Sequence, residues 1–402
     1  MSKPYTQIVR IVVLISVFGQ SGPVFGQSGT AAWITGVERF EIVSRLTGAS
    51  SMNRTDLVGI GGTDLGHMVN HNGRTYFLFG DTFSGETPSQ GGNWRHNVMA
   101  YSTDLTPSDG IVFNDWIKDV NGLAREVIHS GRGNPITEIP TGAISVDNRI
   151  YAYYMAVNWW GPPGQWTINY AGLASWQEGN SQFAVVDNFA FAPNGNFGMV
   201  AASKRSPLEN VQDDHVYLWG TPPGRFGGVK LTRVLPGQIA DQSAYRFFDG
   251  MVGGTPQWTT DEFAADLIVP PTVGEMSVMY NEAVGAWTLL YFNETNDSFE
   301  IRQAATPWGT WSDPVLVATS AQAPGGLYAP YMNPLFVEDG GKTIYFTMSL
   351  WNPYDVYLAK ATLTIVPEPS SLMLCATGLS ALGFVSYLGY GVRRGTGRGK
   401  RG

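Results

Sequence analysis

Short, nearly uninterrupted runs of apolar residues recur five times along the chain. These runs occupy residues 74–80, 150–157, 215–219, 287–292 and 343–348. A partner segment follows each run, at residues 98–102, 170–175, 229–233, 301–305 and 356–360. Apolar runs of this length predict β-strands, and the lack of polar alternation predicts that both strand faces are buried. The pattern therefore predicts five antiparallel sheets that bury their faces against one another.

The spacing of the runs distinguishes between two all-β architectures. Their anchor residues, at positions 76, 151, 217, 288 and 345, are 57 to 75 residues apart. Such units are long enough for four strands each, and radial repetition of four-stranded blades is the β-propeller architecture. A two-sheet sandwich is the alternative, but it favours shorter and more even strand spacing. The sequence therefore predicts an all-β, five-bladed β-propeller.

Two aspartates meet at one end of the first predicted hairpin. Asn72-Gly73 is a strong signal for a tight hairpin turn, and a turn centred there sets Asp64 directly opposite Asp81. Opposed like charges are destabilising, and sharing one site raises the pKa of one carboxyl. The resulting neutral and ionised pair is what general acid/base chemistry uses. The alternative is structural, with Asp81 as a turn cap and Asp64 as a surface residue.

The same construction places more polar residues on this rim. In the fourth unit, a turn centred on residue 284 sets Glu275 opposite Asn293, and in the fifth unit Asn333 opposes Thr347. We expect Glu275 to support or replace one of the two aspartates, and the amides to bind hydroxyl groups of a ligand. The alternative for Glu275 is a solvated strand end.

Tryptophans follow the strands that end on this face. Asn158-Trp159-Trp160 follows the second apolar run, and Trp351 follows the fifth. Acids and indole rings around a central depression suit stacking on sugar rings, with the amide of Asn158 available to hydroxyls. The alternative for Trp159 and Trp160 is packing between blades.

Composition narrows the chemistry. The 402 residues are 43% apolar and contain one cysteine, Cys375, which excludes a disulfide scaffold, a cysteine protease and a cysteine-based zinc site. The chain holds no phosphate loop, no Gly-x-Ser-x-Gly and no His-Glu-x-x-His, so we predict neither an organic cofactor nor a metal. Asp213-Asp214 with rim carboxylates is an alternative Ca²⁺ site, but it lacks Asp-x-Asp-x-Asp spacing, and His215 is interpreted as a strand start.

Charge excludes one class of partner. The net charge is −8, and residues 27–366 hold 18 basic against 32 acidic residues, a net charge of −14. A body this acidic repels nucleic acid phosphates, so no nucleic acid partner is predicted.

The two ends of the chain are predicted to direct export. Residues 1–26 have two basic residues before an apolar run and a small-residue cleavage site, which is typical of a signal peptide, and residues 27–39 are predicted to be a linker. Residues 366–402 combine Pro367-Glu368-Pro369, an apolar stretch at 370–390 that is long enough to cross a bilayer, and a basic end.

This three-part tail resembles the PEP-CTERM sorting signal of Gram-negative bacteria. The resemblance implies processing by an exosortase-type enzyme, transient anchoring in the inner membrane by the helix at 370–390, and delivery to the cell surface or extracellular matrix. A plain single-pass anchor is the alternative.

The body also resembles a known family. The segments that carry the resemblance are Gly-Gly-Thr-Asp-Leu-Gly at 61–66, residues 72–83, residues 216–227 and residues 328–334. They are similar to the family catalogued as domain of unknown function 4185, and the resemblance covers roughly residues 40–362 of a propeller predicted at 40–365. It implies a five-bladed propeller in a family that includes endo-D-arabinanases, with Asp64 and Asp81 matching the paired acids and Glu275 a weaker match.

Two functional hypotheses follow from these features. The first is a secreted glycoside hydrolase that cleaves a furanose, arabinan-like polysaccharide by paired-carboxylate catalysis. Carboxyl groups about 5–5.5 Å apart would retain, and groups about 6.5–9.5 Å apart would invert, the anomeric configuration, and the sequence leaves both open. The second is a non-catalytic surface propeller that binds exopolysaccharide or a protein partner.

Overall fold

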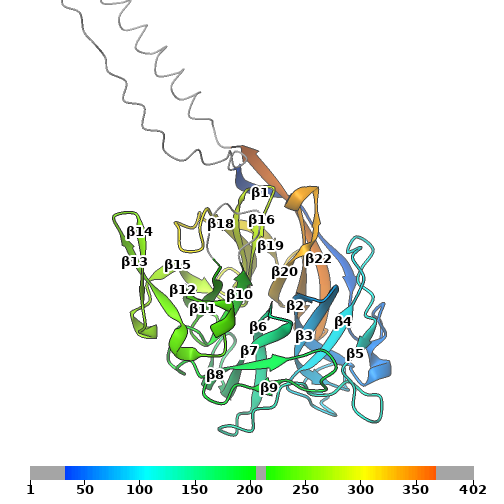
Figure 1. Ribbon diagram of the computed structural model, residues 1–402. Coiled ribbons are helices and arrows are strands. Elements are labelled where there is room, and N and C mark those ends of the chain that lie inside the picture. The colour runs from blue at the N-terminus through cyan, green and yellow to red at the C-terminus, as the bar shows by residue number, and fades with distance from the viewer. Residues whose placement is uncertain (1–31, 205–213, 368–402) are drawn as a thin grey trace, which may run out of the picture.

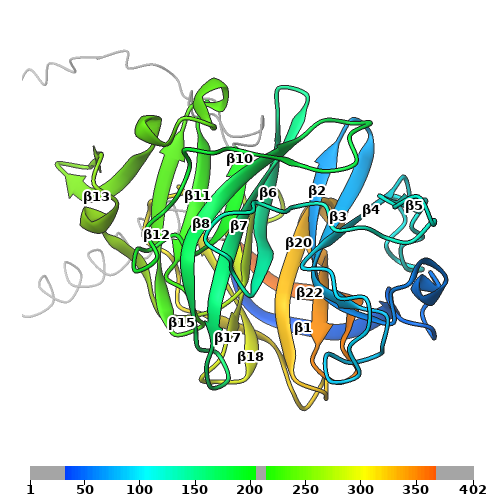
Figure 2. The same cartoon turned by 90° about the horizontal axis from the view of Figure 1, so that it is seen from below.

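Five antiparallel sheets surround a common axis in the computed structural model, which describes residues 32–204 and 214–367 (Figures 1 and 2). The predicted signal peptide, the first part of the linker, Asp213, and the sorting tail from residue 368 lie outside the described residues. Within the described ranges, no helix is long and apolar enough to cross a membrane.

Each sheet is one blade of the propeller, and its strands are hydrogen-bonded in the order given. The first blade consists of β2 (Gly62–His71), β3 (Arg74–Phe83), β4 (Val98–Ser102) and β5 (Asp115–Trp116). The second consists of β6 (Thr137–Val146), β7 (Arg149–Trp160), β8 (Trp166–Trp176) and β9 (Ala184–Val185). The fourth consists of β16 (Met276–Asn281), β17 (Ala286–Asn293), β18 (Ser298–Ala304) and β19 (Val315–Thr319).

The third and fifth blades depart from this simple order. The third consists of β10 (Met199–Lys204), β11 (Val216–Thr221), β12 (Gly227–Val234), β13 (Arg246–Val252) and β14 (Thr255–Thr259), with β15 (Leu267–Val273) paired to β12. The fifth consists of β20 (Leu327–Glu338), β21 (Thr343–Leu350), β22 (Asp355–Pro367) and β1 (Ala32–Arg45). Short 3-10 helices lie at Thr55–Val58, Pro236–Gln238, Gln242–Ala244, Glu262–Ala264 and Asp339–Gly341. The predicted five-bladed propeller is confirmed, and each of the five predicted strand pairs falls on a pair of neighbouring strands.

Burial of both strand faces explains why the blades stack. Every residue of β11, β17 and β21 is buried, as the uninterrupted apolar runs predict. Aromatic pairs join adjacent blades: the ring centroids of Trp219 and Trp287 lie 5.3 Å apart, and those of Tyr76 and Trp176 lie 5.2 Å apart. Contacts of this kind stabilise by about 0.5–1.5 kcal/mol beyond the burial of their area.

The N-terminal strand closes the ring. β1 runs antiparallel to β22 from the pair Ala32–Pro367 to the pair Arg45–Tyr357, and so forms the outer strand of the fifth blade (Figure 2). The prediction that residues 27–39 form a linker is therefore wrong for residues 32–39, which belong to β1. Nothing local in the sequence signals this role, because the partner strand lies more than 300 residues away.

A buried polar cluster fastens the end of β1 to the start of β22. The carboxylate of Asp355, which is fully buried, pairs with the guanidinium of Arg45 and accepts a hydrogen bond of 2.8 Å from the hydroxyl of Thr47. The Thr47 hydroxyl oxygen in turn accepts a bond of 2.9 Å from the backbone N–H of Val356. Burial raises the pKa of Asp355 to about 7, so its hydrogen bonds are needed to hold the charged form.

We predict that Thr47→Val destabilises the ring closure. The change removes both hydrogen bonds of the hydroxyl and leaves a buried N–H and part of a buried carboxylate without partners, which costs about 2–4 kcal/mol. Chemical denaturation of the wild type and the variant measures this difference. Thr35→Val is the matched control on β1, because Thr35 is exposed and its change should alter stability by less than about 0.5 kcal/mol. Equal losses in the two variants would contradict the role of Thr47.

Candidate functional site

Asp64 lies near the start of β2 and Asp81 near the end of β3, so both lie at the same end of the first hairpin. Thr63 pairs with Thr82, but Leu65 pairs with Phe79, so the strands carry an irregularity between these pairs. The bulge lies where Asp64 and Asp81 were predicted to form a direct pair. Two residues, Gly80 and Asp81, lie across from Asp64 there, so the predicted direct opposition is wrong.

The bulge gives Gly80 a specific role. A Cβ atom at position 80 would lie 2.3 Å from Oδ1 of Asp64, so the Asp64 carboxyl occupies the space that a side chain at this position would fill. The extra residue opposite Asp64 therefore provides room for an acid beside the backbone of β3.

The Asp64 carboxyl is enclosed by groups from the fifth blade. The hydroxyl of Tyr328 donates a hydrogen bond of 3.0 Å to Oδ2, while Oδ1 is buried and has no hydrogen-bond partner among the described residues. Burial above all, and then the charge of Asp81, raise the pKa of Asp64 to about 7, while hydrogen bonds from Tyr354 and Tyr328 limit the increase. An unpartnered, buried oxygen on a group with this pKa favours the protonated acid near neutral pH.

Asp81 has a different environment. Its Oδ1 accepts hydrogen bonds from the indole N–H of Trp94, at 2.8 Å, and from the hydroxyl of Thr137 in the second blade, at 2.6 Å. Burial raises the pKa of Asp81 to about 6, and these two bonds limit the increase. A raised pKa was expected for one carboxyl of the pair, whereas the pKa is raised for both, and the main cause is burial rather than mutual repulsion.

Glu275 is held in a buried ion pair. Met276 pairs with Tyr291, and the backbone N–H of Phe292 donates to the carbonyl of Glu275, so the predicted pairing of Glu275 with Asn293 is wrong by one residue. The side chain of Arg225 donates three hydrogen bonds of 2.8 to 3.0 Å to the Glu275 carboxylate. Such fork-shaped pairing fixes the position and orientation of the carboxylate.

Arg225 links the third blade to the fourth and the fifth. Its second terminal nitrogen donates to Glu294 at 3.1 Å, and its guanidinium lies 5.0 Å from the ring centroid of Tyr328 and 5.7 Å from that of Trp166. The charges of Glu275 and Glu294 hold the pKa of Arg225 above its usual range against the effect of its burial. The guanidinium is thus a permanent cation beside the tyrosine that binds Asp64.

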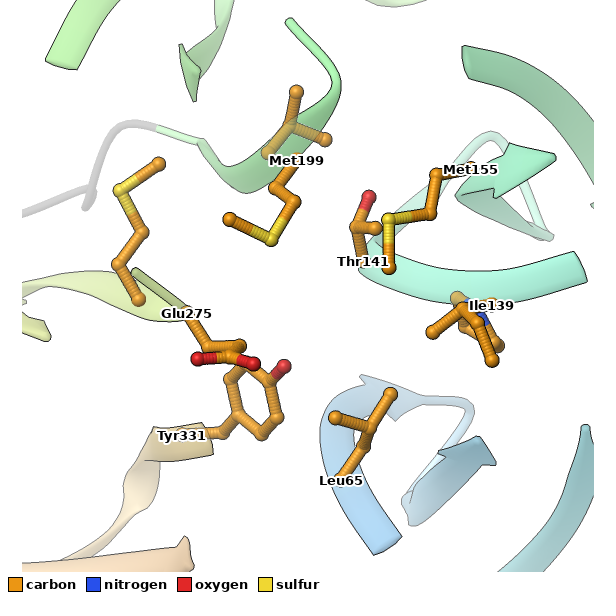
Figure 3. Close-up of a pocket in the computed structure, with 10 residues that line it drawn as sticks. Leu65, Ile139, Thr141, Met155, Met199, Glu275 and Tyr331 are labelled. Atoms are coloured by element: carbon orange, nitrogen blue, oxygen red, sulfur yellow. The ribbon is translucent and has the colours of Figure 1, made fainter. Parts of the chain in front are cut away.

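A small pocket lies between the inner strands near the axis (Figure 3). Its walls come from all five blades, with Glu275 and Tyr331 on one side and Leu65, Ile139, Thr141 and Met155 across from them. The lining is mostly apolar, and the Glu275 carboxylate points along the ring of Tyr331. Glu275 therefore connects the pocket to the acids of the rim.

Exposed tryptophans flank the acids. Trp351 is 60% exposed, and its ring centroid lies 6.4 Å from that of Tyr328 and 5.5 Å from that of Tyr354, the two tyrosines that contact Asp64. Trp94 is 46% exposed and donates to Asp81. Trp94 thus contacts Asp81 directly, whereas Trp351 packs against the two tyrosines that contact Asp64.

The strand β7 extends a further aromatic surface. Its last residues, Trp159 and Trp160, are about half exposed, and Trp160 packs edge-on against Trp166. These rings are thus available on the surface rather than enclosed between blades. Asn158 is exposed too, but its amide is engaged with Asn169 and Thr167.

The structure engages two predicted ligand-binding residues in other contacts. Asn293 is buried, and its amide donates to Glu300 and accepts from the backbone of the β17–β18 turn, so it stabilises a turn. Asn333 lies in an irregular part of β20 rather than opposite Thr347, which pairs with Tyr331. The Asn333 amide exchanges hydrogen bonds with the amide of Asn70. Asn70 lies six residues after Asp64 on β2, so this contact is roughly 20 Å from Asp64.

Sequence reasoning missed the groups that bind the acids. These groups lie in loops or at strand starts, and each contacts an acid that is between 13 and 290 residues away in sequence. They are Trp94, which contacts Asp81, Arg225, which contacts Glu275, and Tyr328 and Tyr354, which contact Asp64. Residues 216–227 and 328–334 carried the family resemblance, which was the one signal for Arg225 and Tyr328. The site as a whole offers a proton donor, a proton acceptor and aromatic surfaces beside an axial pocket.

The chain has relatives in bacteria and fungi. It is 26% identical over 333 residues to the Notoamide biosynthesis cluster protein J' of Aspergillus versicolor, a match that covers 78% of this chain and 85% of that protein. A protein of Bacteroides ovatus described as a putative hydrolase superposes with a TM-score of 0.56 at 15% identity, covering 76% of this chain and 86% of that chain. Native Bacillus subtilis arabinanase is more distant, with a TM-score of 0.41 at 11% identity over 75% of this chain and 96% of that chain. At 15% identity, the likeness to the Bacteroides ovatus protein concerns the fold alone.

The family is shown by a match over most of the chain. The model described as Domain of unknown function (DUF4185) covers residues 50–360, which includes Asp64, Asp81, Arg225, Glu275 and Tyr328. The resemblance predicted from the sequence motifs is therefore confirmed, and the chain belongs to the DUF4185 family.

Proposed function

We propose that this protein is a glycoside hydrolase that cleaves a furanose, arabinan-like polysaccharide with Asp64 and Asp81 as its catalytic carboxyls. The observation that carries the proposal is that two neighbouring acids on one rim both have raised pKa values, about 7 for Asp64 and about 6 for Asp81. Raised pKa values cluster at catalytic sites because acid and base must exchange protons near neutral pH.

The two environments support a division of roles. Asp64 has the higher pKa and an unpartnered oxygen, so it acts as the general acid and protonates the glycosidic oxygen. Asp81 has the lower pKa and two hydrogen-bond donors to its carboxylate, so it acts in the ionised form, as the base for water or as the nucleophile. Water is the second substrate, and this chemistry needs no cofactor.

Glu275 supports this pair rather than replacing either member. Its carboxylate is committed to Arg225, and its negative charge contributes to the raised pKa of Asp64. Arg225 in turn lies beside Tyr328, so the ion pair positions the tyrosine that binds Asp64.

The aromatic rim supports a polysaccharide as the substrate. Trp94 and Trp351 present exposed indoles beside the two acids, and Trp159 and Trp160 extend the surface outward. Rings of this kind bind the apolar faces of sugars along a chain. The furanose, arabinan-like identity of the polymer comes from the resemblance of the opening motif at 61–66 and 72–83 to a family that includes endo-D-arabinanases.

The chain ends support export. We propose that residues 1–26 direct secretion and that an exosortase-type enzyme recognises Pro367-Glu368-Pro369, so that the propeller reaches the cell surface or extracellular matrix. A polysaccharide substrate outside the cytoplasm fits this location.

We predict that Asp64→Asn and Asp81→Asn each abolish cleavage and raise the thermal midpoint at pH 8. Burial raises both carboxyl pKa values, so the folded state disfavours the charged acids, and a neutral amide relieves about 1–3 kcal/mol. The test is chromatography of oligosaccharides released from a panel of arabinans and other polysaccharides, with thermal unfolding in parallel. Asp313→Asn, at an exposed acid, is the control that should change neither reading.

The binding-module hypothesis makes the opposite prediction in the same experiment. It is favoured by the exposed indoles of Trp94, Trp159, Trp160 and Trp351, because stacking on sugar rings does not require that a bond be cleaved. Retention of one polymer without release of oligosaccharides, and unchanged binding by Asp64→Asn, would replace the hydrolase with a non-catalytic surface propeller.

The pH profile of cleavage should be bell-shaped with its maximum between about pH 6 and 7. Activity increases as Asp81 ionises near pH 6 and decreases as Asp64 loses its proton near pH 7. Both pKa values lie above those of the unfolded chain, so stability is greatest at low pH in this window and decreases as pH increases through about 7. Initial rates and thermal midpoints from pH 4.5 to 9 measure the two curves, and a rate that keeps increasing above pH 8 would contradict Asp64 as the acid.

Gly80→Ala should reduce cleavage by at least about tenfold while the protein stays folded. The new Cβ atom meets Oδ1 of Asp64 at 2.3 Å and displaces the carboxyl from its position, and misplacement of about 1 Å is costly in catalysis. Gly237→Ala is the matched control, since a Cβ atom there meets no atom within 4 Å. Full activity in Gly80→Ala would show that the enclosed position of Asp64 is not needed.

A further inference from the structure

We propose that His96, His129 and Glu138 form a binding site for a divalent transition metal of the Zn²⁺ class, in the seam between the first and second blades. One ligand atom from each of the three residues lies within 4.8 Å of the others. His96 lies between β3 and β4, His129 between β5 and β6, and Glu138 in β6. The sequence alone predicts no metal here, because the three residues have no ligand spacing characteristic of a motif.

A single buried amide assembles the three segments. Asn97 is fully buried, and its oxygen accepts hydrogen bonds from the backbone N–H groups of Val127 and Ile128, at 3.1 and 2.7 Å. Its nitrogen donates to the carbonyls of Ile128 and Glu138, both at 2.9 Å. The residue next to His96 thereby fixes the loop that carries His129 and the strand that carries Glu138. Such support around the ligands is what metal sites need for fixed geometry.

Glu138 is a buried acid that lacks a strong cationic partner. Its side chain is 1% exposed and accepts hydrogen bonds from the backbone N–H and the hydroxyl of Ser130. Among the described residues no lysine or arginine forms an ion pair with it, and the nearest basic atom is Nδ1 of His129, at 3.7 Å. A buried carboxylate is costly unless a positive charge compensates it, and a bound cation would supply that charge.

A second carboxylate lies between the two imidazoles. Glu126 approaches Nδ1 of His129 at 3.2 Å and Nδ1 of His96 at 3.6 Å, and it also accepts the backbone N–H of His96 at 2.9 Å. Nδ1 of His96 is enclosed and has no hydrogen-bond partner among the described residues. The cluster thus offers two imidazoles and the Glu138 carboxylate around one point, with Glu126 beside both histidines and one imidazole nitrogen unused.

The ligand set selects the metal. Two histidines and a glutamate are a common zinc set that keeps a fourth position open, whereas Ca²⁺ and Mg²⁺ prefer oxygen ligands alone. Ligand atoms about 2.0–2.2 Å from Zn²⁺ must approach one another more closely than 4.8 Å. The side chain of His129 is 59% exposed and can rotate to close this distance, while Glu138 and His96 stay fixed.

The site adjoins the proposed catalytic centre without sharing a ligand with it. The ring of Trp94 packs edge-on against His96 with centroids 5.1 Å apart, and its indole N–H donates to Asp81. Thr137, the other donor to Asp81, directly precedes Glu138 in β6. A bound ion would therefore fix the two elements that hold Asp81, whatever reaction the rim performs.

The test is metal binding by the full-length protein, prepared without a histidine tag and stripped with a chelator. After equilibration with Zn²⁺ and removal of the free ion, elemental analysis should find about one Zn²⁺ per chain, and Zn²⁺ should raise the thermal midpoint. Co²⁺ should bind in its place and give the visible absorption of a low-coordinate site. None of these readings depends on enzymatic activity, so the metal site and the proposed hydrolase can fail separately.

Variants assign the ligands. His129→Ala should weaken Zn²⁺ binding by more than about 100-fold, since loss of supporting partners alone costs 10–100-fold, and the exposed position of His129 leaves the fold intact. Glu138→Gln, which keeps the shape of the side chain, should also lose the ion, whereas His215→Ala, outside the cluster, should bind as the wild type does. Equal Zn²⁺ content in wild type and His129→Ala, or no Zn²⁺ in the wild type, would overturn the proposal and leave the cluster as an ion-pair network.

Discussion

Closure of the ring by β1 is the constraint on which the rest of the structure depends. A propeller blade buries both faces only if every neighbour is present, and the fifth blade is complete only when the N-terminal strand pairs with β22. The Arg45–Asp355 pair and the hydroxyl of Thr47 fix the two strands at the point where they meet. Loss of this closure would open the seam between the fifth and first blades.

That seam and its neighbours build the functional rim. Tyr328 of the fifth blade binds Asp64 of the first, and Thr137 of the second binds Asp81. Arg225 of the third blade binds Glu275, which directly precedes the first strand of the fourth blade. Each acid is therefore held by a blade other than its own, so the geometry of the site is a property of the closed ring rather than of any one sheet.

Burial of the two ionisable aspartates lowers the stability of the folded propeller. Asp64 and Asp81 both have pKa values raised by burial, which means that the folded state holds charge in an unfavourable place. The aromatic contacts between blades stabilise the folded state elsewhere and offset this loss of stability. The cluster of His96, His129 and Glu138 also lies at a seam between blades, and it combines a buried carboxylate with a half-buried and an exposed imidazole.

The sequence by itself determined the repeat and therefore the fold. An uninterrupted apolar run indicates a strand with both faces buried, so five such runs at long, similar intervals predicted five blades. The Asn72-Gly73 turn placed the two aspartates at one end of a hairpin. Only the tertiary structure decided the register at the bulge, the use of residues 32–39 as a closing strand, the engagement of Asn293 in a turn, and the position of Asn333 away from the two aspartates. It also brought Tyr328, Arg225 and Trp94 to the acids and the two histidines to Glu138. The reason is physical: periodicity is a local property of the chain, whereas bulges, strand closure and side-chain pairs between blades depend on contacts between residues far apart in sequence.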